Sequence, residues 1–173
     1  MKYYLNYILY YFDLNFLLAG SKAHKILHAR TDHTRLSYFL EAKSLSNVEA
    51  VKYGIQTEEK ARNRYIEITN HDVKSIGLFV SSKFPWLAAS PDGLFKIDTE
   101  LALLEIKCPF SCKDSTLRNI PYLDKDGNLK KTHVYYTQIQ LTAWICGCKI
   151  AYLFLYTSKD QKILEIKLDE PFV

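Results

Sequence analysis

The sequence predicts an α/β fold in which a mixed β-sheet is flanked by α-helices. The chain has 173 residues, of which 48% are hydrophobic and 24% charged, and this length and composition are typical of one globular domain. Segments with helical and strand periodicity follow one another as helix, several strands, helix and two strands. That order places helices on the faces of a mixed sheet.

The first element is the apolar segment 1–19, which we expect to form an N-terminal amphipathic helix. Lys2 and the apolar run that follows also resemble a signal peptide. Asp13 argues against insertion, because an aspartate in the middle of a membrane costs about 2.5–3.5 kcal/mol. We therefore expect a packed helix and no membrane association. Its apolar side chains recur at helical spacing, at Leu5, Ile8, Leu9, Phe12 and Phe16.

Residues 20–173 are expected to form one domain. A short helix should follow Ser21 and a longer one should run from Asn47 to about Thr69, since Ser and Asn are favoured N-cap residues. A polar and basic excursion at 111–131 should precede a last helix. The remaining elements are strands at about 73–80, 86–90, 93–97, 101–107, 149–157 and 162–168, and the last helix at about 132–146.

Charge and cysteine content limit the function classes only weakly. A formal net charge of +4 permits a nucleic-acid partner without identifying one, because binding depends on local basic patches. The spacing of the four cysteines could suggest a zinc site, but Cys146 and Cys148 fall at a predicted helix end, where the geometry for zinc ligands is poor. We expect reduced thiols, as in an intracellular protein. The other two cysteines are Cys108 and Cys112.

Three charged side chains interrupt a predicted hairpin of otherwise apolar residues. In the segment Leu-Ala-Leu-Leu-Glu-Ile-Lys, the strand period of two places Glu105 and Lys107 side by side on one face. A hairpin with a two-residue loop would place Asp92 opposite one of them, and opposed side chains start about 4.5–5.5 Å apart at Cβ. Two carboxylates and an ammonium group should therefore converge.

Converging carboxylates favour a bound cation. They repel each other unless a cation lies between them, and Mg²⁺ prefers hard oxygen ligands. Such an ion polarises a phosphodiester and lowers the pKa of a bound water, and Lys107 could position that water or offset phosphate charge. The alternative is that Asp92 is a surface aspartate beside an ordinary ion pair of Glu105 and Lys107.

Two helical residues could complete this group. Gly54, Glu58, Ala61 and Tyr65 form one stripe of a predicted helix, so Glu58 should sit on a largely apolar face. An acid there needs a partner or a metal; an ion pair with a lysine would also satisfy it. Gln138 is similarly a polar group on a packing face, where it could bind a phosphate, a metal-bound water or Lys107, or be a satisfied core amide.

Together these residues resemble the PD-(D/E)XK nuclease superfamily and, within it, the YqaJ-type viral recombinase and lambda exonuclease family. The resemblance runs through GIQTEEKARNRY, PWLAASPDGL, LLEIKCPF and YYTQIQLTAW, in that order. It covers roughly residues 20–170. It implies a restriction-endonuclease-like fold and a Mg²⁺-dependent exonuclease, with Mn²⁺ as a substitute, that degrades one strand of duplex DNA from the 5′ end.

The resemblance also implies roles by position. The metal ligands would be Asp92, Glu105 and the carbonyl of Ile106. Lys107 would be the catalytic lysine, Glu58 would reach a second metal or its waters, and Gln138 would orient the lysine or the attacking water.

The expected DNA contacts depart from the family pattern in one respect. The family carries an arginine shortly before the segment matching AGSKAHKIL, and this sequence has none there. Basic residues that follow could substitute for it, and the excursion at 111–131 could neutralise a duplex backbone. The residues expected to contact DNA are Ser21, Lys22, Lys25, Arg30, Ser90 and Lys113.

The expected partners are double-stranded DNA ends, a homotrimer of the chain and a single-strand-annealing recombination protein. Two other functions stay open: a catalytically decayed DNA-binding copy, or an interaction domain whose motif residues are plain ion pairs. A third possibility is an endonuclease, which would cut closed circular DNA where an exonuclease cannot.

Overall fold

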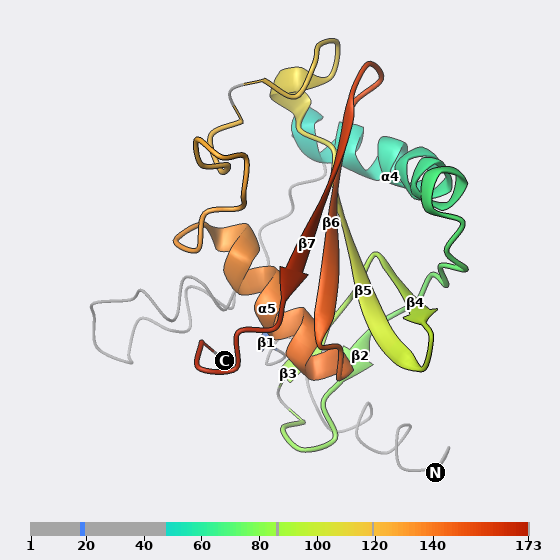
Figure 1. Cartoon of the computed structure of the whole chain (residues 1–173), viewed down its shortest axis with the longest axis vertical. Helices are drawn as coiled ribbons and strands as arrows, with labels where there is room; N and C mark the ends of the chain where they lie inside the picture. The colour runs from blue at the N-terminus through green and yellow to red at the C-terminus, as the bar shows by residue number, and fades with distance from the viewer. Residues whose placement is uncertain (1–17, 20–47, 86, 119, 173) are drawn as a thin grey trace.

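A four-stranded mixed sheet forms the centre of the molecule, confirming the predicted α/β fold. The computed structural model describes residues 18–19, 48–85, 87–118 and 120–172. The strand order is β4-β5-β6-β7, with helix α4 (Glu49–Thr69) and helix α5 (Val134–Cys146) on opposite sides (Figure 1). The strands are β4 (Gly93–Ile97), β5 (Glu100–Lys107), β6 (Ile150–Tyr156) and β7 (Gln161–Lys167).

The register of the sheet follows from its connections. β4 and β5 form an antiparallel hairpin in which Ile97 pairs with Glu100 across a two-residue turn. β5 and β6 run parallel, so the chain must cross over between them. That crossover is the polar excursion, with the short 3₁₀ helix η3 (Phe110–Cys112), followed by α5. β7 then returns antiparallel to β6.

Helix α4 covers one face of the sheet. Its residues Ala61 and Tyr65 are fully buried against the side chains of β5 and β6 that point to that face. The helix begins at Glu49, with Val48 at the N-cap position and no side-chain cap; Asn47 lies outside the described residues. It ends as predicted at Thr69, because Asn70 adopts a left-handed conformation (φ 56°) and returns its N–H to the carbonyl of Ile66.

Helix α5 covers the opposite face and delivers Gln138 to the sheet. The His133 side chain accepts a hydrogen bond from the N–H of Tyr135 and so caps the first turn. Gly147 ends the helix with φ 70°, a conformation that a side chain at Cβ would disfavour. The face of α5 toward the sheet buries Tyr136, Ile139 and Ala143 in the larger hydrophobic core.

Three short strands form a separate small sheet in the order β1-β3-β2. The predicted strand over 73–80 is mostly wrong: only β2 (Phe79–Val80) forms, and Lys74 pairs alone with Leu94. The predicted strand at 86–90 appears as β3 (Leu87–Ala89).

The N-terminal helix prediction is wrong for its last two residues. Leu18 and Ala19 form β1, which pairs in parallel with β3, so their backbone groups are satisfied by a neighbouring strand instead of a helical turn. The rest of 1–19, and the short helix predicted after Ser21, lie outside the described residues. No helix in the described part of the chain combines the length and apolar character needed to span a membrane.

Candidate active site

The β4–β5 hairpin brings two carboxylates and a lysine to one end of the sheet. β4 begins at Gly93, which pairs with Leu104, so Asp92 lies one step beyond the ladder beside Glu105. Alternation along β5 sends Leu103 into the core under α5 and Leu104 into the core under α4. Glu105 and Lys107 share the face of Leu103 because side chains two residues apart point the same way.

Glu105 is the most deeply buried acid of the group, with 1% of its surface exposed. Its Oε1 accepts hydrogen bonds from Lys107 Nζ (2.5 Å) and from Gln138 Nε2 (2.6 Å). Its Oε2 is buried and has no hydrogen-bond partner among the described residues. Oε1 thus accepts two hydrogen bonds, whereas Oε2 is available to a ligand. A ligand is expected there, since a buried unpaired carboxylate oxygen is costly.

Asp92 is held with its carboxylate toward the strand that carries Glu105. Its Oδ2 accepts a hydrogen bond from the N–H of Ile106 at 2.6 Å. Burial and, after it, the charge of Glu105 raise the pKa of Asp92 to about 7, against the opposing effects of Lys107 and the Ile106 N–H. The charge of Glu105 therefore opposes the ionisation of Asp92.

Lys107 is the cation of the group, with 18% of its side chain exposed. Its Nζ also lies 4.8 Å from the centre of the Tyr135 ring, within range of a cation–π contact. Burial lowers the pKa of Lys107, but the charges of Glu105 and Asp92 together outweigh burial and raise it above its ordinary value. Lys107 therefore stays protonated at neutral pH and can act as a hydrogen-bond donor and positive charge.

Glu58 reaches the same place from α4, but its setting differs from the predicted apolar face. Ile55, which helical spacing places beside the stripe of Gly54 and Glu58, is 68% exposed, so this part of the helix face is open to solvent. Glu58 Oε1 pairs with Arg62 Nη2 at 2.5 Å. Arg62 also donates from Nε to the backbone carbonyl of Asp92 at 2.9 Å. The sequence interpretation missed Arg62, although its spacing of four residues from Glu58 is a readable signal for an ion pair.

A cavity of about 310 Å³ opens over these residues. A larger hollow of about 1250 Å³ lies along β7 and the C-terminal segment, and none of the predicted site residues lines it. We assign the site by its convergent charged groups instead of by size. The smaller cavity is lined by Ala50, Val51, Gly54, Ile55, Glu58, Asp92, Glu105, Ile106, Lys107, Cys108, Pro109, Tyr122, Tyr135 and Gln138.

The donor set suits a hard divalent cation. No group of three or more His, Cys, Asp or Glu side chains in the described part of the chain has metal-site geometry. Two features still fit a cation at Asp92 and Glu105: the unpaired buried Oε2 of Glu105, and the raised pKa of Asp92, which an adjacent positive ion would lower.

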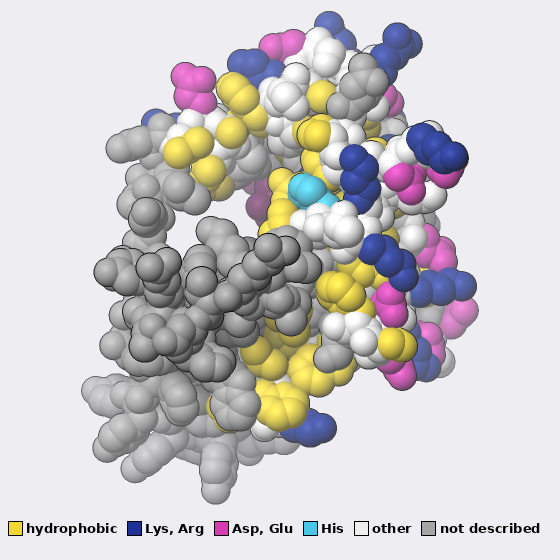
Figure 2. Space-filling model, turned by 90° about the vertical axis from the view of Figure 1, so that its left-hand side faces the viewer, with side chains coloured by type: hydrophobic (Ala, Val, Ile, Leu, Met, Phe, Trp, Pro, Cys, Tyr) yellow, Lys and Arg dark blue, Asp and Glu magenta, His cyan; other side chains and the backbone are white. Residues whose placement is uncertain are grey.

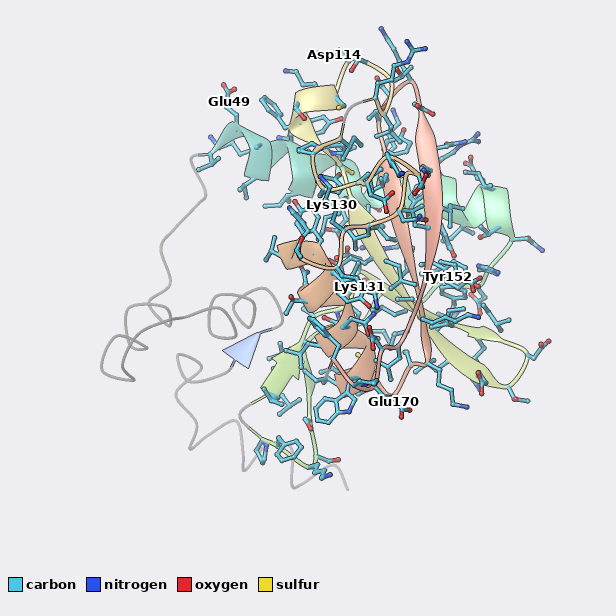
Figure 3. The ribbon with its side chains drawn as sticks, turned by 60° about the vertical axis from the view of Figure 1, so that its left-hand side comes forward. Glu49, Asp114, Lys130, Lys131, Tyr152 and Glu170 are labelled. Carbon is cyan, nitrogen blue, oxygen red and sulfur yellow. The ribbon has the colours of Figure 1, made fainter. Side chains whose placement is uncertain are left out.

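The residues expected to contact DNA do not line this cavity in the described part of the chain. Ser90 is exposed after β3, and Lys113 is exposed with its Nζ 4.6 Å from the centre of the Phe110 ring. Lys130 and Lys131 lie on the excursion near α5 (Figure 3). On the face seen in Figure 2, Lys and Arg side chains intermingle with Asp and Glu, without a patch of one sign. Four expected contacts lie outside the described residues: Ser21, Lys22, Lys25 and Arg30.

All four cysteines are free thiols, as expected. Burial raises the pKa of Cys108 and Cys146 to about 11 and that of Cys148 to about 12. These groups are therefore protonated at neutral pH and are poor metal ligands, which require the thiolate.

Tyr122, in the wall of the cavity, carries a buried hydroxyl with no hydrogen-bond partner among the described residues. Replacing Tyr122 with Phe should raise the free energy of unfolding by about 1 kcal/mol, because the hydroxyl loses its hydration without gaining a bond. Thermal unfolding should show an increase of about 2–4 °C. Tyr136→Phe is the control: its hydroxyl donates to Asp169 at 3.0 Å, so that variant should lose stability. A loss in both variants would contradict the prediction.

Comparison with known proteins identifies one matching family and several solved structures with a similar fold. The profile of a family described as YqaJ-like viral recombinase domain matches residues 15–149. No protein with a curated description matches the chain by sequence. Among solved structures, LHK-Exo in complex with dAMP is similar with a TM-score of 0.70 and 23% identity, over 90% of this chain and 80% of that chain.

LHK-Exo is described as an alkaline exonuclease from Laribacter hongkongensis. A phage-related exonuclease from Haemophilus somnus 129PT is similar with a TM-score of 0.62 and 13% identity, over 90% of this chain and 86% of that chain. At these identities the likeness shows a shared fold.

Proposed function

Because the chain belongs to the YqaJ-like viral recombinase family, we propose that it is a divalent-metal-dependent DNA exonuclease of the PD-(D/E)XK type. Its substrate would be the end of a DNA duplex, degraded from 5′ to 3′ in recombination or repair. The name of LHK-Exo, a protein of the same fold described as an alkaline exonuclease, supports this activity.

The observation that carries the proposal is the state of Glu105. A fully buried carboxylate with one unpaired oxygen, facing a second acid and bonded to a lysine, is costly in a protein that only needs a core. Such an arrangement is typical of a site where a cation and a charged substrate complete the interactions.

The cation-binding residues would be Asp92 and Glu105, with the carbonyl of Ile106 as a further ligand and Glu58 near a second cation or its waters. Mg²⁺ is the proposed ion, with Mn²⁺ as a substitute. When bound, the cation would polarise the phosphodiester and lower the pKa of an attacking water.

Side chains of the protein would supply the remaining catalytic interactions. Lys107, protonated and held by Glu105, would donate to a phosphate oxygen and offset its growing negative charge. Gln138 bonds Glu105 in this structure, so it would hold the carboxylate in the orientation that Lys107 needs. The aromatic wall made by Tyr135 and Tyr122, with ring centres 5.0 Å apart, would exclude water from one side of the cavity.

The proposed setting is an intracellular one, in which the enzyme supplies single strands to a strand-annealing protein and assembles as a homotrimer on duplex DNA. The basic excursion, with Lys113 exposed at its start, would lie near the DNA backbone together with Ser90.

The test is hydrolysis of linear duplex DNA with a 5′ phosphate by the intact protein, in Mg²⁺ and in EDTA, beside closed circular DNA of the same sequence. We expect nucleotide release from the linear DNA only, abolished by EDTA. Cutting of the closed circle would make the protein an endonuclease. DNA binding without release in either Mg²⁺ or Mn²⁺ would make it a decayed copy and would overturn the proposed activity.

A further inference from the structure

Arg62 joins the two elements that carry the acids of the site. It lies on α4, four residues after Glu58, and only 16% of its side chain is exposed. Its Nη2 binds the carboxylate of Glu58 at 2.5 Å, and its Nε donates to the backbone carbonyl of Asp92 at 2.9 Å. One guanidinium group therefore contacts a side chain of the helix and the main chain at the start of β4.

The contact with Asp92 acts immediately before the sheet begins. Asp92 lies before the first ladder pair of β4, which is Gly93 with Leu104. Its carboxylate is held by the N–H of Ile106 and its carbonyl by Arg62. Both ends of the residue are thus fixed, which sets the direction in which the carboxylate meets Glu105.

We infer that Arg62 is a positioning residue of the cation site, fixing the main chain of Asp92 and the carboxylate of Glu58 relative to each other. The inference rests on the proposed function, because it takes these acids as cation ligands. Arg62 does not line the cavity and does not touch a reacting group. It acts through the two acids, as hydrogen-bonded partners outside a metal's ligand shell do.

The role requires an arginine in particular. The planar guanidinium presents several N–H donors at fixed angles, so one side chain can hold two acceptors that lie apart. A lysine in its place would keep the positive charge but would concentrate its donors on one atom. Arg62→Lys therefore separates the geometry that Arg62 imposes from the charge that it carries.

Arg64 provides a matched control two residues further along the same helix. It is 47% exposed and contacts Glu67 and Gln161, away from both acids of the site. Arg64→Lys makes the same chemical change on the same helix without touching Asp92 or Glu58.

The experiment measures Mn²⁺ binding to the intact chain without DNA, by titration calorimetry and by the electron spin resonance signal of free Mn²⁺. Circular dichroism and thermal unfolding record the fold of each variant. We expect Arg62→Lys to remain folded and to bind Mn²⁺ about 10–100-fold more weakly than the unchanged protein. Arg64→Lys should bind Mn²⁺ as the unchanged protein does.

The other outcomes separate the two proposals. Equal Mn²⁺ affinity in Arg62→Lys and Arg64→Lys would overturn the positioning role while leaving the nuclease proposal intact. Arg62→Gln, which removes the charge and keeps one amide donor, should also bind more weakly; tighter binding would mean that Arg62 acts by charge repulsion alone. Unfolding of both Arg62 variants would make it a residue of the fold and overturn the inference. Absence of Mn²⁺ binding by the unchanged protein would instead overturn the proposed function.

Discussion

Replacing Lys107 with Met is expected to lower the Mg²⁺-dependent rate of DNA hydrolysis by about a thousandfold. Lys107 is the one Lys or Arg among the described residues that line the cavity. Its ammonium group is held by Glu105 and lies against Tyr135, so it is fixed in place before substrate arrives. Donors fixed in this way at developing charge contribute about 10²–10³ in rate, and a group that also transfers or orients protons contributes up to about 10⁴.

The same change also threatens the fold, and the experiment must separate the two effects. Without Lys107 the carboxylate of Glu105 keeps only Gln138 as a hydrogen-bond partner among the described residues, while it remains buried. Removing one member of a buried ion pair costs about 3–5 kcal/mol. The double change Lys107→Met with Glu105→Gln removes the uncompensated charge, so it should restore part of the lost stability without restoring the rate of hydrolysis.

The measurement is a single-turnover rate at saturating DNA, with the folded fraction recorded by circular dichroism. Lys149→Met is the control, because Lys149 forms an exposed ion pair with Glu100 at the opposite end of β5. That variant should keep the full rate. A folded Lys107→Met protein that hydrolyses DNA at more than a tenth of the normal rate would contradict a role for this lysine.

The sheet and the acidic hairpin were predictable because both depend on periodicity along one segment. Alternation in β5 assigns Leu103 and Leu104 to opposite faces, and the two-residue turn between Ile97 and Glu100 sets the register of the hairpin. The sequence therefore predicted Asp92 opposite Glu105 or Lys107, and the observed register places it beside Glu105.

Contacts between elements were not predictable from periodicity. Gln138 binds Glu105, a partner that the sequence did not identify. The sequence left open a phosphate, a metal-bound water, Lys107 or the partners of a core amide, because the partner depends on how α5 crosses β5. Ile55 shows the same limit: it lies beside the predicted stripe on α4 and is exposed, because the sheet covers only the part of the helix near Ala61 and Tyr65. The ion pair of Arg62 with Glu58 could be predicted from their spacing of four residues on a helix. The hydrogen bond of Arg62 to Asp92 joins residues 30 positions apart, so no local sequence pattern indicates it.

Raising the pH from 5 to 8 in the presence of EDTA should destabilise the unchanged protein through Asp92. Its pKa is about 7 in the folded chain and 3.8 in the reference state. Between these values the folded protein holds a proton that the unfolded chain has released, so the stability it contributes is present at low pH and lost as the pH rises through 7. The interval from pH 5 to the folded pKa is about two pH units, so the free energy of unfolding should fall by about 3 kcal/mol between pH 5 and pH 8.

The isosteric change Asp92→Asn should remove this pH dependence, because an amide can still accept the Ile106 N–H but cannot ionise. Urea unfolding at pH 5 and pH 8 measures the effect as the difference between the two proteins. That difference cancels the contribution of His71, whose pKa is lowered by burial and which therefore acts with the opposite sign. Asp126→Asn, on the exposed turn, is the control. If the free energy of unfolding changed equally between pH 5 and pH 8 in Asp92→Asn and in the unchanged protein, the prediction would be contradicted.

A divalent cation should reverse the trend, which ties this stability effect to the proposed site. A cation bound beside Asp92 favours its ionised form, so binding releases the proton and becomes stronger as the pH rises. Mg²⁺ should therefore stabilise the unchanged protein more at pH 8 than at pH 5, and Asp92→Asn should respond much less. If Mg²⁺ instead stabilised both proteins equally, the ion would be binding elsewhere, and the burial of Asp92 and Glu105 would need a different explanation.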